Sequence, residues 1–124
     1  MLITYEVFAV DRVIRETWHG TITISMLRQH WDTMLRDHEC QPIRRTLADL
    51  RQASLVFSER ELQDAVREVG FRLLAGGDWT SAIVVGKSSQ LRMASRYQAV
   101  ASIFSTDAIF STEEEAVRWL IRQA

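Results

Sequence analysis

The sequence predicts one α/β domain, spanning residues 1–124, built on a mixed β-sheet with the element order β-β-α-β-α-β-α-β-α. Short apolar runs rich in β-branched residues alternate with segments whose apolar residues recur every three or four positions. Two of the helical segments begin with the Ser/Thr-x-x-Glu pattern of a capping box. The chain has 124 residues, 47% of them hydrophobic, and no internal repeat or linker, so it is long enough to close one hydrophobic core.

The first two strands are predicted to form a β-hairpin, and a helix follows them. Residues 2–10 mix β-branched and aromatic residues with isolated polar ones, and residues 12–19 do the same before Gly20. Within residues 24–38, apolar residues recur at spacings of three and four, which indicates one face of a helix of about four turns. Pro42 closes the connection after this helix.

The centre of the chain predicts a buried strand followed by a second helix. Residues 45–50 have the short apolar character of a buried strand. Ser58 and Glu61 form a capping box, in which the serine accepts from a free amide of the first turn and the glutamate reaches back to the cap. Gly76-Gly77 is expected to end this helix. The core-facing residues of the helix are predicted to be Leu62, Ala65, Val66, Val69 and Leu73.

The last third of the chain predicts two further strand–helix units. Residues 81–85 form a compact apolar strand that ends at Gly86, and residues 108–110 form a short final strand. A second capping box, from Ser111 to Glu114, opens the last helix. The apolar face of the third helix is predicted to be Met93, Tyr97, Val100 and Phe104. That of the last helix is predicted to be Ala116, Val117, Leu120 and Ile121.

The alternation of strands and helices also predicts where a ligand would bind. After the hairpin, the strands are expected to pair in parallel through right-handed crossovers. Ligands of such sheets bind beyond the carboxyl ends of the strands, which places Arg51, Lys87, Ser88 and Ser89 near one crevice. Two cations and the free amides at a helix start would hold a phosphate or a carboxylate there. The alternative is that Arg51 pairs with Asp49 or a helix end and that Lys87 is merely solvated.

Composition and charge exclude several classes of protein. With 15 Lys and Arg against 16 Asp and Glu, the net charge of −1 creates no global attraction to nucleic acid, so no nucleic-acid partner is expected. The single Cys40 cannot form an internal disulfide. The N-terminal residues lack the pattern of a signal peptide, and no apolar stretch approaches the roughly 20 residues of a transmembrane segment. A cytoplasmic location is therefore expected.

Three segments resemble the SpoIIAA-like, or STAS/SEC14-type, small bacterial domains. They are residues 20–23 before the first helix, residues 47–51 at the central strand and residues 110–120 at the end of the chain. The resemblance covers essentially the whole chain. It implies βα units that wind as a right-handed superhelix, and frequent homodimers, but it implies no reaction.

The best-understood members of this group suggest one modification site. They are anti-sigma-factor antagonists, which are phosphorylated on a serine of an Asp-Ser-Ser-Gly-Leu loop that opens the helix after the central strand. That loop falls on residues 57–62, where Ser58 matches one serine and the aspartate, the second serine and the glycine are missing. Glu59 and Glu61 would also repel an added phosphate. Ser58 is therefore interpreted as a helix cap, with phosphorylation as the alternative.

The motifs that would support catalysis or metal binding are incomplete. Residues 86–88, Gly-Lys-Ser, are similar to the end of a phosphate-binding loop, but the first glycine of that motif falls on Ser81. His30, His38 and Cys40 lack the spacing of a zinc site. An activated cysteine also needs an orienting group and an oxyanion site, which the sequence does not indicate. No metal site is therefore predicted.

The carboxylates do not form a catalytic arrangement either. Residues 113–115 are three glutamates in the first turn of a predicted helix, where negative charge complements the helix dipole. Asp49 is a lone carboxylate on a predicted buried strand, where its ordinary role is a hydrogen bond to amides or to Arg51. No catalytic residue and no cofactor are predicted, so an enzyme is the third hypothesis.

The chain contains four tryptophans, which is many for its length: Trp18, Trp31, Trp79 and Trp119. Trp79 follows the Gly76-Gly77 break and is predicted to be the most exposed of them. Because aromatic residues are enriched in interface cores, part of this set would lie at a dimer or partner surface. The alternative is that these side chains pack at the rim of the core.

The sequence thus favours a non-catalytic regulatory or scaffolding domain that acts through a protein surface. A homodimer and a regulatory protein partner are the expected assemblies. The alternative function is the binding of a small anionic or lipid-like ligand at the carboxyl ends of the strands, by Arg51, Lys87, Ser88 and Ser89.

Overall fold

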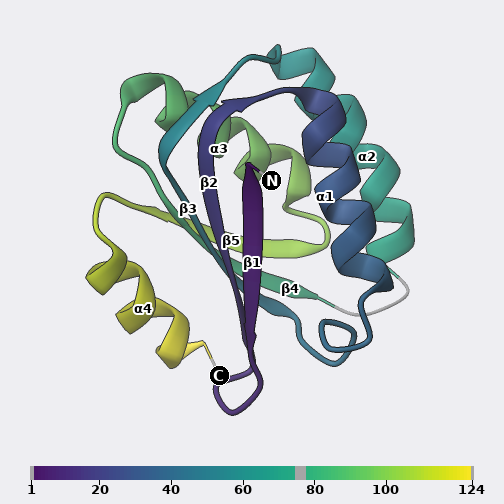
Figure 1. Ribbon diagram of the computed structural model, residues 1–124, viewed down its shortest axis with the longest axis vertical. Helices are drawn as coiled ribbons and strands as arrows, with labels where there is room; N and C mark the ends of the chain where they lie inside the picture. The colour runs from purple at the N-terminus through teal and green to yellow at the C-terminus, as the bar shows by residue number, and fades with distance from the viewer. Residues whose placement is uncertain (1, 75–77, 124) are drawn as a thin grey trace.

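A computed structural model describes residues 2–74 and 78–123 of the chain (Figure 1). The element order in these residues is β-β-α-β-α-β-α-β-α, so the predicted mixed α/β fold is confirmed. The strands are β1 (Ile3–Phe8), β2 (Val13–Ile22), β3 (Arg45–Leu55), β4 (Trp79–Val84) and β5 (Ser105–Phe110). The helices are α1 (Ile24–Arg36), α2 (Glu59–Leu74), α3 (Ser88–Ala101) and α4 (Glu113–Arg122).

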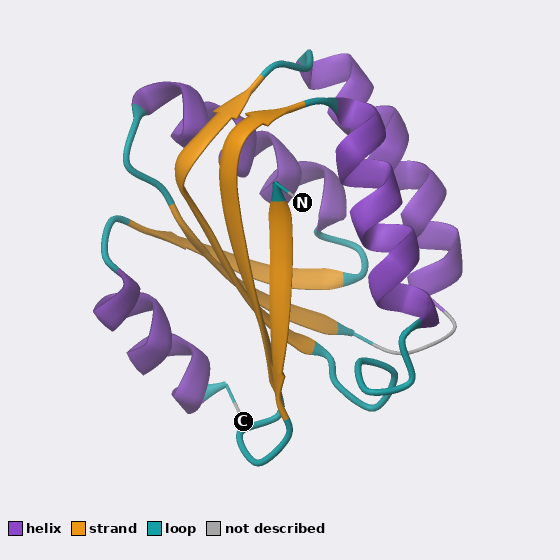
Figure 2. Ribbon diagram, in the orientation of Figure 1, coloured by secondary structure: helices purple, strands orange, loops and turns teal. Residues whose placement is uncertain are grey.

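The strands form one sheet whose order, β1-β2-β3-β4-β5, follows the chain. β1 and β2 are antiparallel, as a hairpin requires, whereas β2, β3, β4 and β5 are parallel to their neighbours. Figure 2 shows the sheet twisting strongly between β1 and β5. The carboxyl ends of the four parallel strands therefore share one edge of the sheet, as predicted.

β3 is longer than the sequence predicts: the strand continues past Leu50 and ends at Leu55. Residues 52–55 pair in parallel with residues 19–22 of β2, after a register shift between Thr17 and His19. This second half of β3 contains polar residues that interrupt the apolar run. Its pairing with β2, which is a long-range interaction, determines that it is a strand.

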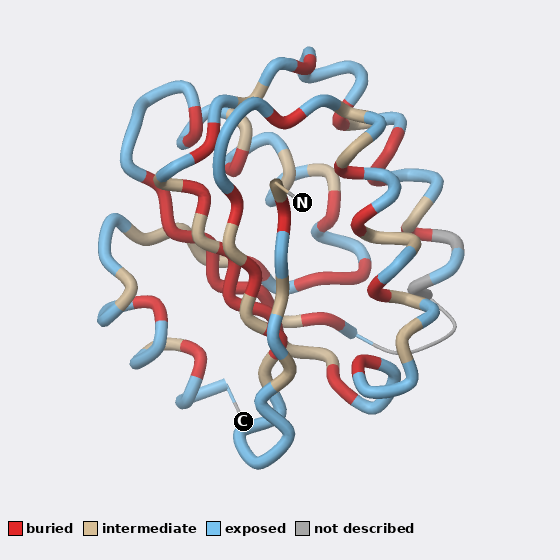
Figure 3. Tube along the Cα trace, in the orientation of Figure 1, coloured by how far each residue is buried: buried red, intermediate tan, exposed pale blue. Residues whose placement is uncertain are grey.

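The two faces of the sheet are covered unequally. Helices α1, α2 and α3 lie on one face, and α4 lies on the other (Figure 2). The larger core, between the sheet and α1–α3, contains Ile14, Leu27, Leu50, Val66 and Ile83, among others. The smaller core joins Leu47, Ala82 and Val84 of the sheet to Ala116 and Leu120 of α4. Buried positions accordingly gather along the central strands and the inner sides of the helices (Figure 3).

The capping predictions are confirmed for α2 and wrong by one residue for α4. At α2, Glu61 N donates to Ser58 Oγ at 3.0 Å and Ser58 N donates to Glu61 Oε1 at 2.9 Å. At α4 the cap is Thr112 rather than Ser111, because Thr112 Oγ1 accepts from Glu115 N at 3.3 Å. Both residues are followed three positions later by glutamate, so the local pattern fits either cap.

The apolar face predicted for α4 is only half correct. Ala116 and Leu120 are buried against the sheet, but Val117 is 38% exposed and Ile121 is 64% exposed. The reason is that, of the described helices, α4 is the one on its face of the sheet (Figure 2). With no neighbouring helix beside it, only a narrow stripe of α4 is covered, and the flanking apolar residues remain accessible.

The prediction that Trp79 is exposed is wrong. Trp79 is the first residue of β4, two positions before the predicted start of the strand, and it is only 6% exposed. Alternation along β4 places Trp79, Ser81 and Ile83 on the face covered by α1–α3. The Arg44 guanidinium lies over the indole ring, 5.1 Å from its centroid.

Other helix predictions differ at the ends of the elements. α1 ends at Arg36 and α3 ends at Ala101, so His38 and Phe104 follow their helices rather than completing a helical face. The predicted break at Gly76-Gly77 and the side chain of Leu73 lie outside the part of the chain that the structure describes. Among the described residues, no helix combines the length and the apolar character needed to cross a bilayer.

Candidate functional site

Arg51, the first residue of the predicted anion site, is engaged by a carboxylate. Arg51 Nε donates to Asp49 Oδ1 at 3.0 Å, and its terminal nitrogen donates to Asp49 Oδ2 at 2.9 Å. Glu113 Oε2 lies 3.8 Å from the same guanidinium. The bidentate pairing lowers the pKa of Asp49 and raises that of Arg51. The charge of Arg51 is therefore already partnered, which is the alternative that the sequence left open.

The other predicted site residues, Lys87, Ser88 and Ser89, are exposed at the start of α3. The backbone amides there are occupied by a side chain that the sequence analysis did not consider. Gln90 is 1% exposed, and its Oε1 accepts from Gly86 N at 2.7 Å and from Lys87 N at 3.1 Å. An anion at this helix start would compete with Gln90 for these amides. Ligand binding by Arg51, Lys87, Ser88 and Ser89 stays a prediction.

A row of polar side chains crosses the inner face of the sheet, under α1–α3. We call Thr46, Ser81 and Asp107 the polar row, because they lie opposite one another on β3, β4 and β5. All three are buried. Thr46 Oγ1 donates to Ser81 Oγ at 2.8 Å, and Ser105 Oγ donates to Asp107 Oδ1 at 2.8 Å. The centre of this core is therefore polar.

Asp107 forms no ion pair within the described residues. It is 8% exposed, and its Oδ2 is buried with no hydrogen-bond partner. Burial raises the pKa of Asp107 to about 6, against the opposing effects of the Ser105 and Ser81 hydroxyls. A carboxyl group of this kind costs folding free energy whenever it is ionised.

A second buried acid, Glu16, lies on β2 on the same face of the sheet. Glu16 is 5% exposed and His30, on α1, is 2% exposed. Their side chains are 2.6 Å apart, from His30 Nε2 to Glu16 Oε1, and Trp18 Nε1 donates to the same oxygen at 3.2 Å. The rings of Tyr5 and Trp18 pack around the His30 imidazole. A His30 ring that carries a proton on Nε2 donates it to Glu16 Oε1.

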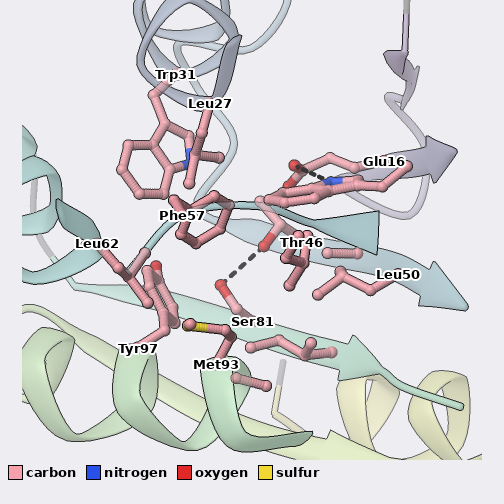
Figure 4. A pocket seen from close by; sticks show the side chains of 15 residues that line it. Glu16, Leu27, Trp31, Thr46, Leu50, Phe57, Leu62, Ser81, Met93 and Tyr97 are labelled. Carbon is pink, nitrogen blue, oxygen red and sulfur yellow. Dashed lines mark hydrogen bonds between the residues drawn. The ribbon is translucent and has the colours of Figure 1, made fainter. Parts of the chain in front are cut away.

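Glu16 and two residues of the polar row, Thr46 and Ser81, border an unfilled space in the larger core (Figure 4). A cavity of about 70 Å³ lies between the sheet and α1–α3. Its polar wall consists of Glu16, Thr46, Ser81 and Tyr97. The remaining wall is formed by apolar side chains, among them Leu27, Trp31, Leu50, Phe57, Leu62, Ile83 and Met93. The site therefore combines a large apolar surface with a few polar groups, as small-molecule sites do.

A second cavity of about 50 Å³ adjoins the first. The residues common to both walls are Glu16, Trp31, Thr46, Ser81 and Tyr97. Trp79 lines only the second of these two cavities, and its Nε1 is buried without a hydrogen-bond partner. The two spaces thus meet at the same polar groups, and an unused donor is present beside them.

Tyr97 of α3 borders both cavities and stays protonated near neutral pH. Burial raises the pKa of the Tyr97 hydroxyl, and the nearby charges of Asp107 and Glu16 raise it further. The ring packs against Trp31 of α1, with 6.2 Å between the centroids. Tyr97 therefore presents a neutral hydroxyl, which both donates and accepts hydrogen bonds.

The sequence patterns did not predict this site, although the sequence contains one signal of it. Glu16 alternates with Ile14 and Trp18 on a strand whose apolar residues face inward, so a polar residue at that position is anomalous. Ser81 and Asp107 are comparable inward positions on β4 and β5. The sequence spacing relates His30 only to His38 and Cys40, whereas in the structure its partner is Glu16.

The arrangement offers binding groups rather than a nucleophile. Within the described residues, no group of three or more His, Cys, Asp or Glu side chains is placed to hold a metal ion. Cys40 is buried, and burial followed by the charges of Asp37 and Glu39 raises its thiol pKa to about 11. The thiol is therefore unreactive near neutral pH. Ser58 uses its hydroxyl to cap α2.

Comparison with known proteins identifies the fold. No family model and no curated protein matches the sequence. Among solved structures, the chain is similar to an uncharacterised protein of the DUF3478 family, with a SpoIIAA-like fold, from Shewanella loihica PV-4. The TM-score is 0.60 at 15% sequence identity, over 95% of this chain and 91% of that one. This match, together with the element order, shows that the chain has a SpoIIAA-like fold.

Proposed function

We propose that this chain is a non-catalytic binding domain that holds a small, mainly apolar molecule between the sheet and helices α1–α3. The observation that carries the proposal is the pair of adjoining cavities around Glu16, Thr46, Ser81 and Tyr97. Protein interiors are close-packed and contain few spaces larger than a water molecule. Unfilled volume beside a few buried polar groups, one of which, Trp79 Nε1, has no hydrogen-bond partner among the described residues, is what a ligand site provides.

A bound molecule at this position would contact several elements of the fold at once. The cavity wall includes residues of β2, β3, β4, α1, α2 and α3. A ligand that binds only the folded state stabilises it in proportion to its concentration and affinity. The domain would therefore respond to its ligand by becoming more rigid, which suits a regulatory role.

A cavity-filling substitution tests this proposal. Ala94 lines the larger cavity and is 4% exposed, so Ala94→Leu places an isopropyl group in the ligand space. Ala99, exposed on the same helix, supplies the matched control Ala99→Leu. Native mass spectrometry after mild purification, followed by thermal-shift screening of small molecules, measures occupancy.

We expect the wild-type chain and Ala99→Leu to take up a small molecule that stabilises them, and Ala94→Leu to lose that response. Two results count against the proposal. One is a wild-type chain that carries no ligand and is stabilised by no compound. The other is an Ala94→Leu variant that binds as well as the wild type.

A second candidate function, regulation or scaffolding through protein contacts, is favoured by an exposed apolar surface beside α4. We call Phe8, Val10, Val117 and Ile121 the α4 patch; their exposed fractions are 42%, 98%, 38% and 64%. A groove of about 360 Å³ runs past Phe8, Val117 and Ile121, and is also lined by Val13, Leu47 and Leu120. Exposed apolar surface of this kind is typical of interaction sites. The predicted homodimer would use it.

The oligomeric state tests this second function. Light scattering after size exclusion should give the mass of a dimer for the wild type and of a monomer for Ile121→Glu. Ile103 is 74% exposed away from the α4 patch, so Ile103→Glu is the control and should remain dimeric. A wild-type monomer that retains no protein partner from its own cells would exclude this function.

A further inference from the structure

The polar wall of the cavities consists largely of hydrogen-bond acceptors. Both hydrogen bonds described for the Glu16 side chain end on Oε1, from His30 and Trp18. Thr46 donates its hydroxyl hydrogen to Ser81, so Thr46 Oγ1 can form a further hydrogen bond only by accepting one. A ligand that donates a hydrogen bond could therefore bond to the acceptor oxygens of Glu16 or Thr46, whereas a purely apolar ligand could not.

The charges around the cavities disfavour an anionic ligand. Among the described residues, no lysine or arginine lines either cavity. The buried acidic side chains at and beside the site are Glu16, which borders it, and Asp107, which extends the row formed by Thr46 and Ser81. A carboxylate or phosphate would lose its hydration and meet two acids.

Two groups in the wall can donate in return. Trp79 Nε1 is buried without a partner at the smaller cavity, and Tyr97 carries a neutral hydroxyl at both. A ligand head that both donates and accepts would use these groups together with Glu16. A hydroxyl group does both in a small volume.

We infer that the ligand is a small apolar molecule with a neutral hydroxyl head, an alcohol or a phenol, whose hydrogen is donated to Glu16. This inference rests on the proposed function and adds the ligand class to it. Together the two adjoining spaces, about 70 and 50 Å³, approach the roughly 150 Å³ of a cavity that binds benzene, so the upper size limit of the ligand is about one ring. Met93, with its flexible side chain, can adjust the wall.

Three probes of similar size test the hydroxyl preference. Phenol and toluene differ by a hydroxyl in place of a methyl group, and pyridine accepts a hydrogen bond but does not donate one when neutral. Binding is followed by NMR titration of the backbone amides at pH 8. We expect phenol to bind about tenfold more tightly than toluene, because a hydrogen bond to a charged acceptor is worth about that factor. Pyridine, which can use only the donors Trp79 and Tyr97, should bind more weakly than phenol.

Glu16→Gln tests whether Glu16 is the residue that accepts the hydrogen bond from the ligand's hydroxyl group. The amide keeps the volume and can still accept from His30 and Trp18, but its NH₂ group donates to the ligand. We expect this variant to lose most of the phenol preference and to favour pyridine. Glu6→Gln, on an exposed residue of β1, is the matched control and should behave as the wild type.

The outcomes separate the two proposals. If no probe binds the wild-type chain, the proposed function fails. If toluene or pyridine binds as tightly as phenol, the domain holds small molecules but the hydroxyl inference is overturned. The comparison among probes in the wild type stands even if Glu16→Gln does not fold, which circular dichroism would reveal.

Discussion

Replacing Asp107 with asparagine should stabilise the fold at pH 8 and change it little at pH 4. Asp107 is 8% exposed, its Oδ2 has no hydrogen-bond partner, and its pKa is about 6 against an ordinary 3.8. At about 1.4 kcal/mol for each pH unit, ionising this carboxyl in the folded state costs roughly 3 kcal/mol. Asparagine removes that ionisation and keeps an oxygen for the Ser105 hydroxyl.

The direction of the pH dependence follows from whether the folded or the unfolded state binds the Asp107 proton more tightly. A carboxyl whose pKa is raised by folding binds its proton more tightly in the folded state, so its contribution to stability is fully present below pH 3.8. That contribution is lost as the pH rises through about 6. The free-energy difference between Asp107→Asn and the wild type should therefore grow by about 2 kcal/mol from pH 4 to pH 8.

Urea unfolding followed by tryptophan fluorescence at both pH values measures this difference. Comparing the variant with the wild type at each pH cancels the contributions of all other acids. Asp64→Asn, at an exposed residue of α2, is the control and should show no such pH dependence. A gain that is the same at pH 4 and pH 8, or a loss at pH 8, would falsify the argument.

Three further predictions concern other parts of the fold. Gln90→Leu should lower the free energy of unfolding by at least about 3 kcal/mol in urea titrations, because it leaves the Leu50 and Ala53 carbonyls of β3 and the Gly86 amide before α3 without this partner. Ser58→Ala should cost about 1 kcal/mol by loss of the α2 cap, while an exposed control, Ser95→Ala, should cost less. Cys40, with a thiol pKa of about 11, should react with iodoacetamide at pH 8 more than about a hundredfold more slowly in the folded chain than in urea, and equal rates would contradict the burial argument.

The order of elements was predictable because local patterns agree with the tertiary fold. The apolar runs of β3 and β4 and the capping box at Ser58 are each readable within a few residues. The second half of β3 was not, because polar residues form a strand there only through pairing with residues 19–22 of β2. Trp79 was misplaced for the same reason, since its burial depends on where β4 begins.

The candidate site was less predictable than the fold. The hydrogen bond between Glu16 and His30 joins a strand to a helix, and the polar row joins three strands across the sheet. Such contacts depend on register and packing, which no local spacing encodes. The inward position of Glu16 was a readable anomaly, but its partner was not.

The bridge made by Gln90 restricts how the cavity can change shape. Its Nε2 donates to Leu50 O at 2.7 Å and to Ala53 O at 2.8 Å, so the first turn of α3 is fastened to β3. Met93, Ala94 and Tyr97 lie progressively farther along the same helix and line the cavity. We therefore expect α3 to rotate as a rigid body about its first turn. A molecule entering the core would displace Tyr97 more than Met93. Because the first turn stays bound to β3, the helix would return to its original position when the molecule leaves.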